Sequence, residues 1–230
     1  MRALGDHLCS AGFAVEGPRL AGHDSDSKRL AETTWRDWVE SVEAVLVNII
    51  DQYPAVFVCG QSLGGLISLE LGRRHNKMHA LASLAAPIWL QPLSESAVRL
   101  IGQSSLLRRI IIPRLTGTDV SDPEMKRLNS EAIGPLGLPI AAVSSLVAFI
   151  DYLRPRLAEI TVPTLLAHAR QDHVAPYACM AAIQSGLRAA PTTTLSLERS
   201  YHLISIDVER QVVFDAVTKH FERHLGESHS

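Results

Sequence analysis

The residues whose types and spacing suit chemistry are Gly60-Gln61-Ser62-Leu63-Gly64, a serine between two glycines in the pattern Gly-x-Ser-x-Gly. The apolar residues 56–59 before them predict a strand buried in a parallel sheet, and residues 65–74 after them predict a helix. A strand that enters a helix within two residues makes a sharp turn, which exposes the serine hydroxyl above the sheet. Ser62 is therefore a candidate nucleophile. Gly60 and Gly64 are expected at this turn because side chains would collide there.

The same turn predicts a site for a negatively charged oxygen. The N–H of Leu63 and the positive end of the following helix would point to the place where an oxyanion forms when a serine attacks a carbonyl carbon. Leu63 is therefore the candidate oxyanion donor. Two glycines and a serine at this spacing also occur by chance in loops, so the interpretation depends on the flanking strand and helix.

A serine hydroxyl becomes a strong nucleophile only when a base takes its proton and a carboxylate holds that base. The candidate carboxylate is Asp172, which follows the predicted strand 164–168, and the candidate base is His202, which follows the predicted strand 192–197. The chain order Ser, Asp, His is the one expected when the nucleophile lies at a strand-to-helix turn. The alternatives are a loop-capping aspartate and a surface histidine, one of ten. Asp151 and Asp207 are interpreted as helix residues, with Asp207 as the N-cap of the last helix.

The composition limits the class of protein. A chain of 230 residues suits one α/β domain with an insertion, and 22 basic against 24 acidic residues make nucleic acid an unexpected partner. The three cysteines lack C-x-x-C spacing, and neither a signal peptide nor an apolar run of membrane-spanning length is found, so we expect a cytoplasmic protein with free thiols. The pairs His75/His79 and His220/His224 lack a third ligand and are interpreted as solvated, so no metal is expected.

The order of predicted elements indicates the fold. Strands and helices alternate over residues 1–86 and 140–225, which predicts a mostly parallel sheet with helices on both faces and a ligand site beyond the carboxyl ends of the strands. Residues 87–139 break this alternation with short helices near 95–102 and 105–112, and they predict a helical cap whose apolar residues either line an acyl pocket or pack the cap onto the domain. Residues 226–230 form a polar tail, which is expected to be disordered. Phe13-Ala14-Val15 predicts a further short strand.

Six segments carry a resemblance to a known family. In order they are Pro18-Arg19-Leu20-Ala21-Gly22-His23, Trp35-Arg36-Asp37-Trp38, Gly60-Gln61-Ser62-Leu63-Gly64-Gly65, Pro163-Thr164-Leu165-Leu166, Gln171-Asp172-His173-Val174-Ala175-Pro176 and Ser200-Tyr201-His202-Leu203-Ile204-Ser205-Ile206-Asp207. Through them nearly the whole chain resembles the α/β-hydrolases, and among these the bacterial carboxylesterase and monoacylglycerol lipase branch. The resemblance implies that Ser62 is the nucleophile, Asp172 the acid, His202 the base and Leu63 an oxyanion donor.

The resemblance also implies an upstream strand that ends in His-Gly and whose loop supplies a second oxyanion donor. Here Met1 already lies at the start of the first predicted helix. Either the natural chain begins further upstream, which we favour, or the strand Phe13-Ala14-Val15 pairs directly with the strand 56–59. In both cases the second donor is missing, and losing one such donor typically lowers a rate by about 10²- to 10³-fold.

The activity that the resemblance implies is hydrolysis of carboxylic esters, either short- to medium-chain acyl esters or monoacylglycerols, through an acyl-enzyme. It implies neither a cofactor nor a metal. Thioesterases, lysophospholipases and serine peptidases use the same triad, and the sequence does not separate them. The alternative from a different class is a non-catalytic binding protein of the same fold, or an inactive truncated chain. The sequence does not predict the oligomeric state.

Overall fold

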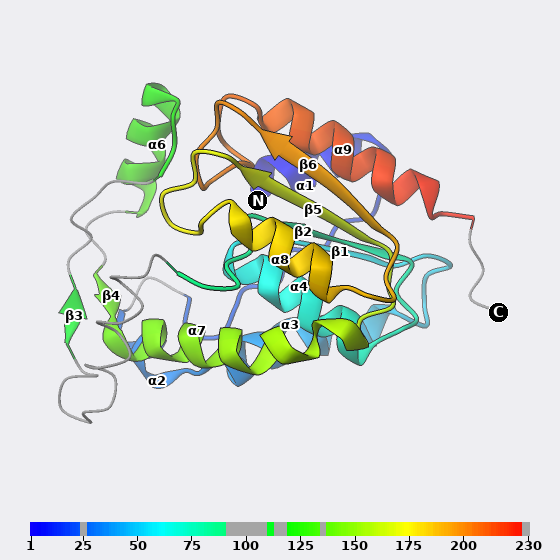
Figure 1. Ribbon diagram of the computed structural model, residues 1–230, viewed down its shortest axis with the longest axis horizontal. Coiled ribbons are helices and arrows are strands. Elements are labelled where there is room, and N and C mark those ends of the chain that lie inside the picture. Colours follow the sequence, from blue (N-terminus) through cyan, green and yellow to red (C-terminus); the bar gives the residue numbers. More distant parts are fainter. Residues whose placement is uncertain (24–26, 91–109, 113–118, 134–136, 227–230) are drawn as a thin grey trace.

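A parallel four-stranded sheet forms the centre of the protein. The computed structural model describes residues 1–23, 27–90, 110–112, 119–133 and 137–226 (Figure 1). The strands are β1 (Phe57–Gln61), β2 (Ala80–Leu84), β5 (Thr164–Ala169) and β6 (Thr192–Leu197), in the spatial order β1-β2-β5-β6. Every neighbouring pair is parallel, so all four strands end at the same edge of the sheet. The predicted catalytic loops leave from that edge.

Helices cover both faces of the sheet, as the alternating sequence pattern predicts. On one face lie α1 (Arg2–Ser10) and α9 (Arg210–Arg223). On the other lie α3 (Trp35–Ile49), α4 (Leu63–Arg74), α7 (Ile140–Leu153) and α8 (Ala178–Gly186). The short helix α2 (Ser27–Glu32) contacts α7, and a 3₁₀ helix, η2 (Arg154–Glu159), continues α7. Pro155 near its start lacks the N–H that an α-helix would need there.

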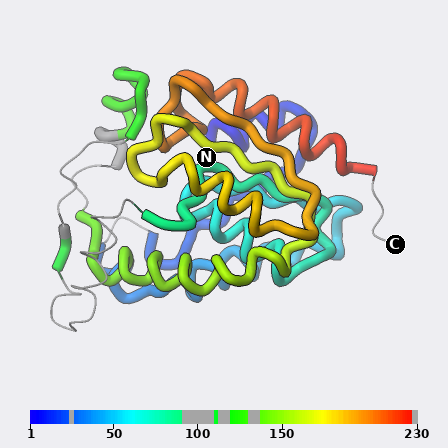
Figure 2. The backbone as a smooth tube through the Cα atoms, viewed as in Figure 1, coloured from blue at the N-terminus to red at the C-terminus, as the bar shows by residue number. Residues whose placement is uncertain are grey.

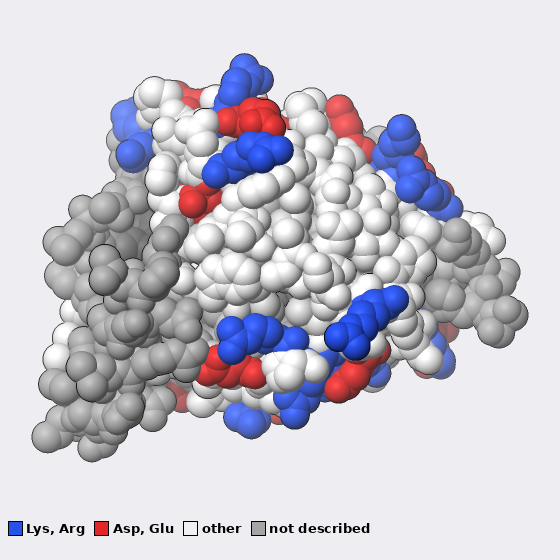
Figure 3. All heavy atoms as spheres, in the orientation of Figure 1, with Lys and Arg blue, Asp and Glu red and all other residues white. Residues whose placement is uncertain are grey.

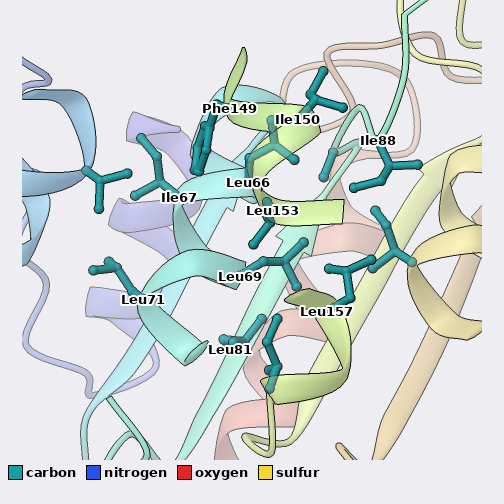
Figure 4. Close-up of a cluster of buried hydrophobic side chains, with 14 of the residues drawn as sticks. Leu66, Ile67, Leu69, Leu71, Leu81, Ile88, Phe149, Ile150, Leu153 and Leu157 are labelled. Atoms are coloured by element: carbon teal, nitrogen blue, oxygen red, sulfur yellow. The ribbon is translucent and has the colours of Figure 1, made fainter. Parts of the chain in front are cut away.

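The larger part of the core lies between the sheet and helices α3, α4, α7 and α8. Figure 4 shows side chains of α4, β2 and α7 meeting there, among them Leu66, Leu81 and Phe149. The Trp35 ring stacks on Phe149 with centroids 4.8 Å apart, which fixes the start of α3 against α7. Ser145 of α7 is buried in this contact, where its hydroxyl oxygen accepts the backbone N–H of Trp35 at 2.7 Å. This contact explains why a serine is buried in the core.

The insertion lies at the end of the molecule toward which the arrows of β5 and β6 point (Figure 1). Its described elements are α6 (Pro123–Ile133) and the antiparallel pair β3 (Ile111–Ile112) and β4 (Leu138–Pro139). The predicted helix near 95–102 lies outside the described residues. Most of the predicted helix near 105–112 also lies outside them, and its last two residues, 111 and 112, form a strand instead of a helix. In Figure 2 the C-terminal end of α9 lies on the opposite side of the molecule. The division into a core and a cap stays a prediction, as does the disordered tail, of which only Gly226 is described.

The predicted strand Phe13-Ala14-Val15 is wrong, because no residue of this segment belongs to a strand. The Phe13 ring instead packs edge-on against Phe57 of β1, with centroids 5.9 Å apart, and against Phe221 of α9. The segment is held by side-chain packing without a hydrogen-bonded ladder. Direct pairing of this segment with β1 is therefore also wrong, and among the described residues β1 pairs with β2 alone.

Charged side chains on the face shown in Figure 3 occur in small groups in which both signs are mixed. Oppositely charged side chains also pair directly among the described residues, as Arg170 Nε does with Glu198 Oε1 at 2.7 Å. Among the helices of the described part of the chain, none has the length and apolar character needed to cross a membrane.

Candidate active site

The sharp turn between β1 and α4, which the sequence predicts, carries Ser62 in a strained conformation. Its backbone has φ +56° and ψ −117°, a region that residues other than glycine seldom adopt. The Ser62 N–H donates to the Leu84 carbonyl of β2 at 2.7 Å, which ties the turn to the neighbouring strand. A side chain at Gly60 would collide with the backbone of Gly64, because strand and helix approach closely there. The turn therefore requires a glycine at position 60.

The same reasoning does not hold for Gly64. A Cβ placed there meets no atom of the described residues within 4 Å, because Gly64 lies on an open side of the first turn of α4. The expectation that a side chain would collide at Gly64 is therefore wrong. The second glycine that the packing needs is Gly65, where a Cβ would lie 2.9 Å from the Ser83 hydroxyl and 3.0 Å from the Ala86 side chain.

The three residues predicted from the sequence lie in hydrogen-bonding contact. His202 Nε2 lies 2.9 Å from Ser62 Oγ, and His202 Nδ1 lies 2.8 Å from Asp172 Oδ2. The carboxylate can only accept, so Nδ1 carries a proton and donates it to Asp172, which leaves Nε2 to accept the proton of the serine hydroxyl. Asp172 and His202 are buried, while Ser62 is partly exposed at the turn. This is the arrangement in which a serine can lose its proton as it attacks.

The Asp172 carboxylate is held by four donors. Oδ1 accepts the backbone N–H groups of Val174 at 2.8 Å and Ala175 at 2.7 Å. Oδ2 faces His202 and also His168 Nε2, at 3.1 Å. Burial alone would raise the pKa of Asp172, but the hydrogen bonds from the two histidines outweigh burial and hold the pKa well below its ordinary value. Asp172 is therefore ionised at neutral pH.

The candidate oxyanion donor Leu63 is the first residue of α4. The first N–H groups of a helix have no acceptor within it, and the helix dipole favours negative charge at this end. The Ser62 carbonyl accepts from Gly65 and Leu66, at 2.9 and 3.2 Å, which fixes the direction of this first turn. The role of the Leu63 N–H as an oxyanion donor stays a prediction, which the position of Leu63 at the start of α4 permits.

Two positioning contacts were missed by sequence reasoning. The Gln61 side-chain oxygen accepts the Ser205 N–H at 3.0 Å, which links β1 to the loop of His202. The Asp119 carboxylate, from the insertion, accepts the backbone N–H groups of His173 and His202, both at 3.1 Å. No local pattern marks Asp119, because its partners are far away in the sequence and the residues around it are irregular.

Asp207 is not the N-cap of the last helix, since α9 is preceded by Glu209 as N-cap. The Asp207 side chain is buried because it binds elsewhere: it accepts the N–H and hydroxyl of Ser121, at 2.9 and 2.7 Å, and the N–H of Tyr201, at 2.7 Å. Asp207 therefore joins the insertion to the loop of His202. No pattern in the sequence indicated this role, because capping of the nearby helix is the simpler interpretation of an aspartate at this place.

The remaining histidines and cysteines form no second reactive centre in the part of the chain that the structure describes. No group of three or more His, Cys, Asp or Glu side chains there could hold a metal ion. The interpretation of His220 and His224 as solvated is wrong: His220, in α9, and His224, the C-cap of α9, are both buried, with ring centroids 5.1 Å apart. Burial lowers the pKa of His220 to about 4, and burial raises the pKa of the Cys59 thiol to about 12. Both groups are therefore uncharged at neutral pH.

The fold and the Ser62–His202–Asp172 geometry are those of an α/β-hydrolase. The sequence model of the Hydrolase_4 family, described as serine aminopeptidase S33, matches residues 1–209, and the chain therefore belongs to this family. The matched residues include the turn at Ser62 and the loops of Asp172 and His202.

Individual relatives agree with this assignment. The chain is 26% identical to a thermostable monoacylglycerol lipase of Bacillus sp. over 226 residues, which are 98% of this chain and 86% of the relative. It is 25% identical to a carboxylesterase of Bacillus subtilis over 224 residues, or 97% of this chain and 87% of that enzyme. A solved structure reported for the metagenome-derived lipolytic enzymes LipS and LipT superposes with a TM-score of 0.85 at 23% identity, covering 97% of this chain and 88% of that one. The predicted fold, and the predicted class of serine hydrolase related to carboxylesterases and monoacylglycerol lipases, are confirmed.

Proposed function

We propose that the protein hydrolyses carboxylic esters of short- to medium-chain acids or monoacylglycerols through an acyl-enzyme on Ser62. The observation that carries the proposal is the pair of hydrogen bonds at His202, 2.9 Å to the Ser62 hydroxyl and 2.8 Å to the Asp172 carboxylate. The names of the related lipase and carboxylesterase support the substrate class. We also propose a cytoplasmic location, which the three free cysteines support.

In the proposed acylation step, Ser62 Oγ attacks the ester carbonyl carbon while His202 Nε2 takes the hydroxyl proton. The resulting imidazolium is stabilised by the ionised Asp172 carboxylate. Negative charge that develops on the carbonyl oxygen is stabilised by the Leu63 N–H and the positive end of α4. His202 then gives its proton to the departing alcohol, and the acyl group remains on Ser62.

In the proposed deacylation step the same groups act on water. His202 Nε2 takes a proton from water, which attacks the acyl carbon, and then returns the proton to Ser62 Oγ as the acid leaves. The ring needs no reorientation between the steps, because Asp172 holds Nδ1 in place throughout. The cycle consumes one ester and one water and regenerates the free serine.

The test uses p-nitrophenyl esters of increasing acyl length with the wild-type protein and the Ser62→Ala variant. We expect turnover by the wild type and a loss of at least about 10³-fold in kcat for the variant. A fluorophosphonate probe should label the wild type and not the variant. An aminoacyl p-nitroanilide in the same assay tests the peptidase activity that the family description raises.

Two results would contradict the proposal. Folded wild-type protein that neither turns over any ester nor reacts with the probe would favour a non-catalytic binding protein. Hydrolysis of the anilide at a higher kcat/KM than any ester would reassign the enzyme to the peptidases.

A further inference from the structure

A second histidine, His168, contacts the Asp172 carboxylate and is not used by the mechanism above. It lies near the end of β5 and is 1% exposed. Its Nε2 lies 3.1 Å from Asp172 Oδ2 and 3.0 Å from the backbone carbonyl of Ala175. Both neighbours are acceptors only, so Nε2 must carry a proton that it shares between them. The contact fixes the tautomer of a buried ring.

The two histidines meet on one oxygen atom. Asp172 Oδ2 accepts from His202 Nδ1 at 2.8 Å and from His168 Nε2 at 3.1 Å, whereas Oδ1 is held by two backbone N–H groups of its own loop. The donors to Oδ1 fix the distance of the carboxylate from the loop. The rotation that aims Oδ2 at His202 is limited by the second histidine, because a turn of the carboxylate would break that hydrogen bond.

We propose that His168 is a positioning residue that holds the Asp172 carboxylate in the orientation His202 requires. The inference rests on the proposed function, since the carboxylate matters to catalysis only if His202 acts as the base. His168 touches neither Ser62 nor the reacting atoms in this arrangement and acts through Asp172 alone. Its effect is therefore on kcat, with little effect on how the substrate binds.

A purely structural role is the competing explanation. The His168 ring packs edge-on against Tyr177 with centroids 6.2 Å apart, and its bond to the Ala175 carbonyl closes the loop of Asp172. Loss of packing would lower stability in any variant that removes the ring. Loss of the donor to Asp172 lowers kcat only in variants that lack an N–H at this place.

The kinetic test compares His168→Gln, which keeps an N–H donor near the position of Nε2, with His168→Met, which keeps the volume and removes the donor. We expect kcat to fall by about tenfold in His168→Met, as loss of one hydrogen bond to a charged group implies, with KM within about twofold. The His168→Gln variant should retain kcat within about threefold of the wild type. His220→Leu, at a buried histidine of α9, is the matched control and should keep the wild-type kcat.

A measurement on the wild-type protein keeps the proposal testable even if a variant does not fold. Nitrogen-15 NMR of labelled histidine should show His168 with its proton on Nε2. The opposite tautomer would overturn the proposal, as would equal kcat losses in the Gln and Met variants, or a His168→Met variant with wild-type kcat. Absence of any esterase activity in the wild type would instead overturn the proposed function, and the NMR result would still report whether His168 Nε2 carries the proton that the contact with Asp172 requires.

Discussion

Asp119 and His202 are 83 positions apart in the sequence, yet the Asp119 carboxylate accepts the backbone N–H of His202 at 3.1 Å. The same carboxylate accepts the N–H of His173, and its second oxygen lies 2.8 Å from His173 Nδ1. His173 follows Asp172 directly in the chain. One side chain of the insertion therefore holds both loops that carry the proposed acid, Asp172, and the proposed base, His202.

Replacing Asp119 by alanine should lower both stability and activity. The backbone N–H of His202 is left without its acceptor, which we expect to cost about 1–3 kcal/mol in the free energy of unfolding. With the loop less firmly held, kcat should fall by about tenfold, as a misplaced catalytic group implies. Denaturant unfolding and ester kinetics measure the two effects.

Asp122→Ala is the matched control for Asp119→Ala. Asp122 lies in the same segment, but its carboxylate accepts the N–H groups of Glu124 and Met125 at the start of α6. Its loss should cost about 1 kcal/mol of stability, as for a helix N-cap, and leave kcat unchanged. Equal loss of kcat in both variants would show that the insertion acts through its overall stability and not through the contact with His202.

Stability should depend on pH through Asp207. Burial alone would raise the pKa of Asp207, but hydrogen bonds from Ser121 and Tyr201 outweigh burial and lower the pKa below its ordinary value of 3.8. A depressed pKa in the folded state contributes stability above the unfolded pKa, and this contribution is lost as the pH falls through the folded pKa. The Asp207→Asn variant should therefore be less stable than the wild type by about 1–3 kcal/mol at neutral pH, and the difference should narrow below about pH 4.

Urea unfolding at a series of pH values measures this difference. Asp215→Asn, at an exposed carboxylate of α9 with 66% side-chain exposure, serves as the control and should show little difference from the wild type at any pH. A difference for Asp207→Asn that stays constant down to pH 3 would indicate that the charge of Asp207 contributes nothing and that the shape of its side chain alone matters.

The two glycines beside Ser62 should respond in opposite ways to alanine. At Gly60 a Cβ would collide with the backbone of Gly64, which cannot move without opening the turn, so Gly60→Ala should cost more than about 3 kcal/mol or prevent folding. At Gly64 the space is open among the described residues, and an alanine in the first turn of α4 should raise stability by up to about 1 kcal/mol. Thermal unfolding of the two variants distinguishes these outcomes, and a folded, stable Gly60→Ala variant would contradict the geometry of the turn.

The sequence predicted the parts of this protein that depend on local pattern. The strand before Ser62 and the helix after it were recognisable because one apolar run ends at the Gly-x-Ser-x-Gly turn. Asp172 and His202 were recognisable because each follows a strand, and parallel strands bring their carboxyl ends to one edge. The contact among the three residues then follows from the topology.

What the sequence did not predict depends on distant partners. His168, Asp119 and Asp207 are polar residues whose roles come from carboxylate contacts between separate loops, and no spacing rule links such loops. Phe13-Ala14-Val15 has the composition of a strand, but a strand also needs a neighbouring edge with which to pair, and β1 does not pair with it. Gly64 matched a motif, although the packing places the constraint at Gly65.

The backbone strain at Ser62 should be measurable as a difference between two inactive variants. With φ at +56°, the residue at position 62 adopts a conformation that costs a side chain about 1–3 kcal/mol and costs glycine almost nothing. Ser62→Gly should therefore be more stable than Ser62→Ala by about 1 kcal/mol, although both lack the nucleophile. As the control, Ala181→Gly at an exposed position of α8 should lower stability by about 1 kcal/mol, the opposite sign. If Ser62→Gly is instead the less stable of the two variants at position 62, the backbone of Ser62 is not strained. Exposing the serine hydroxyl would then cost the fold no stability.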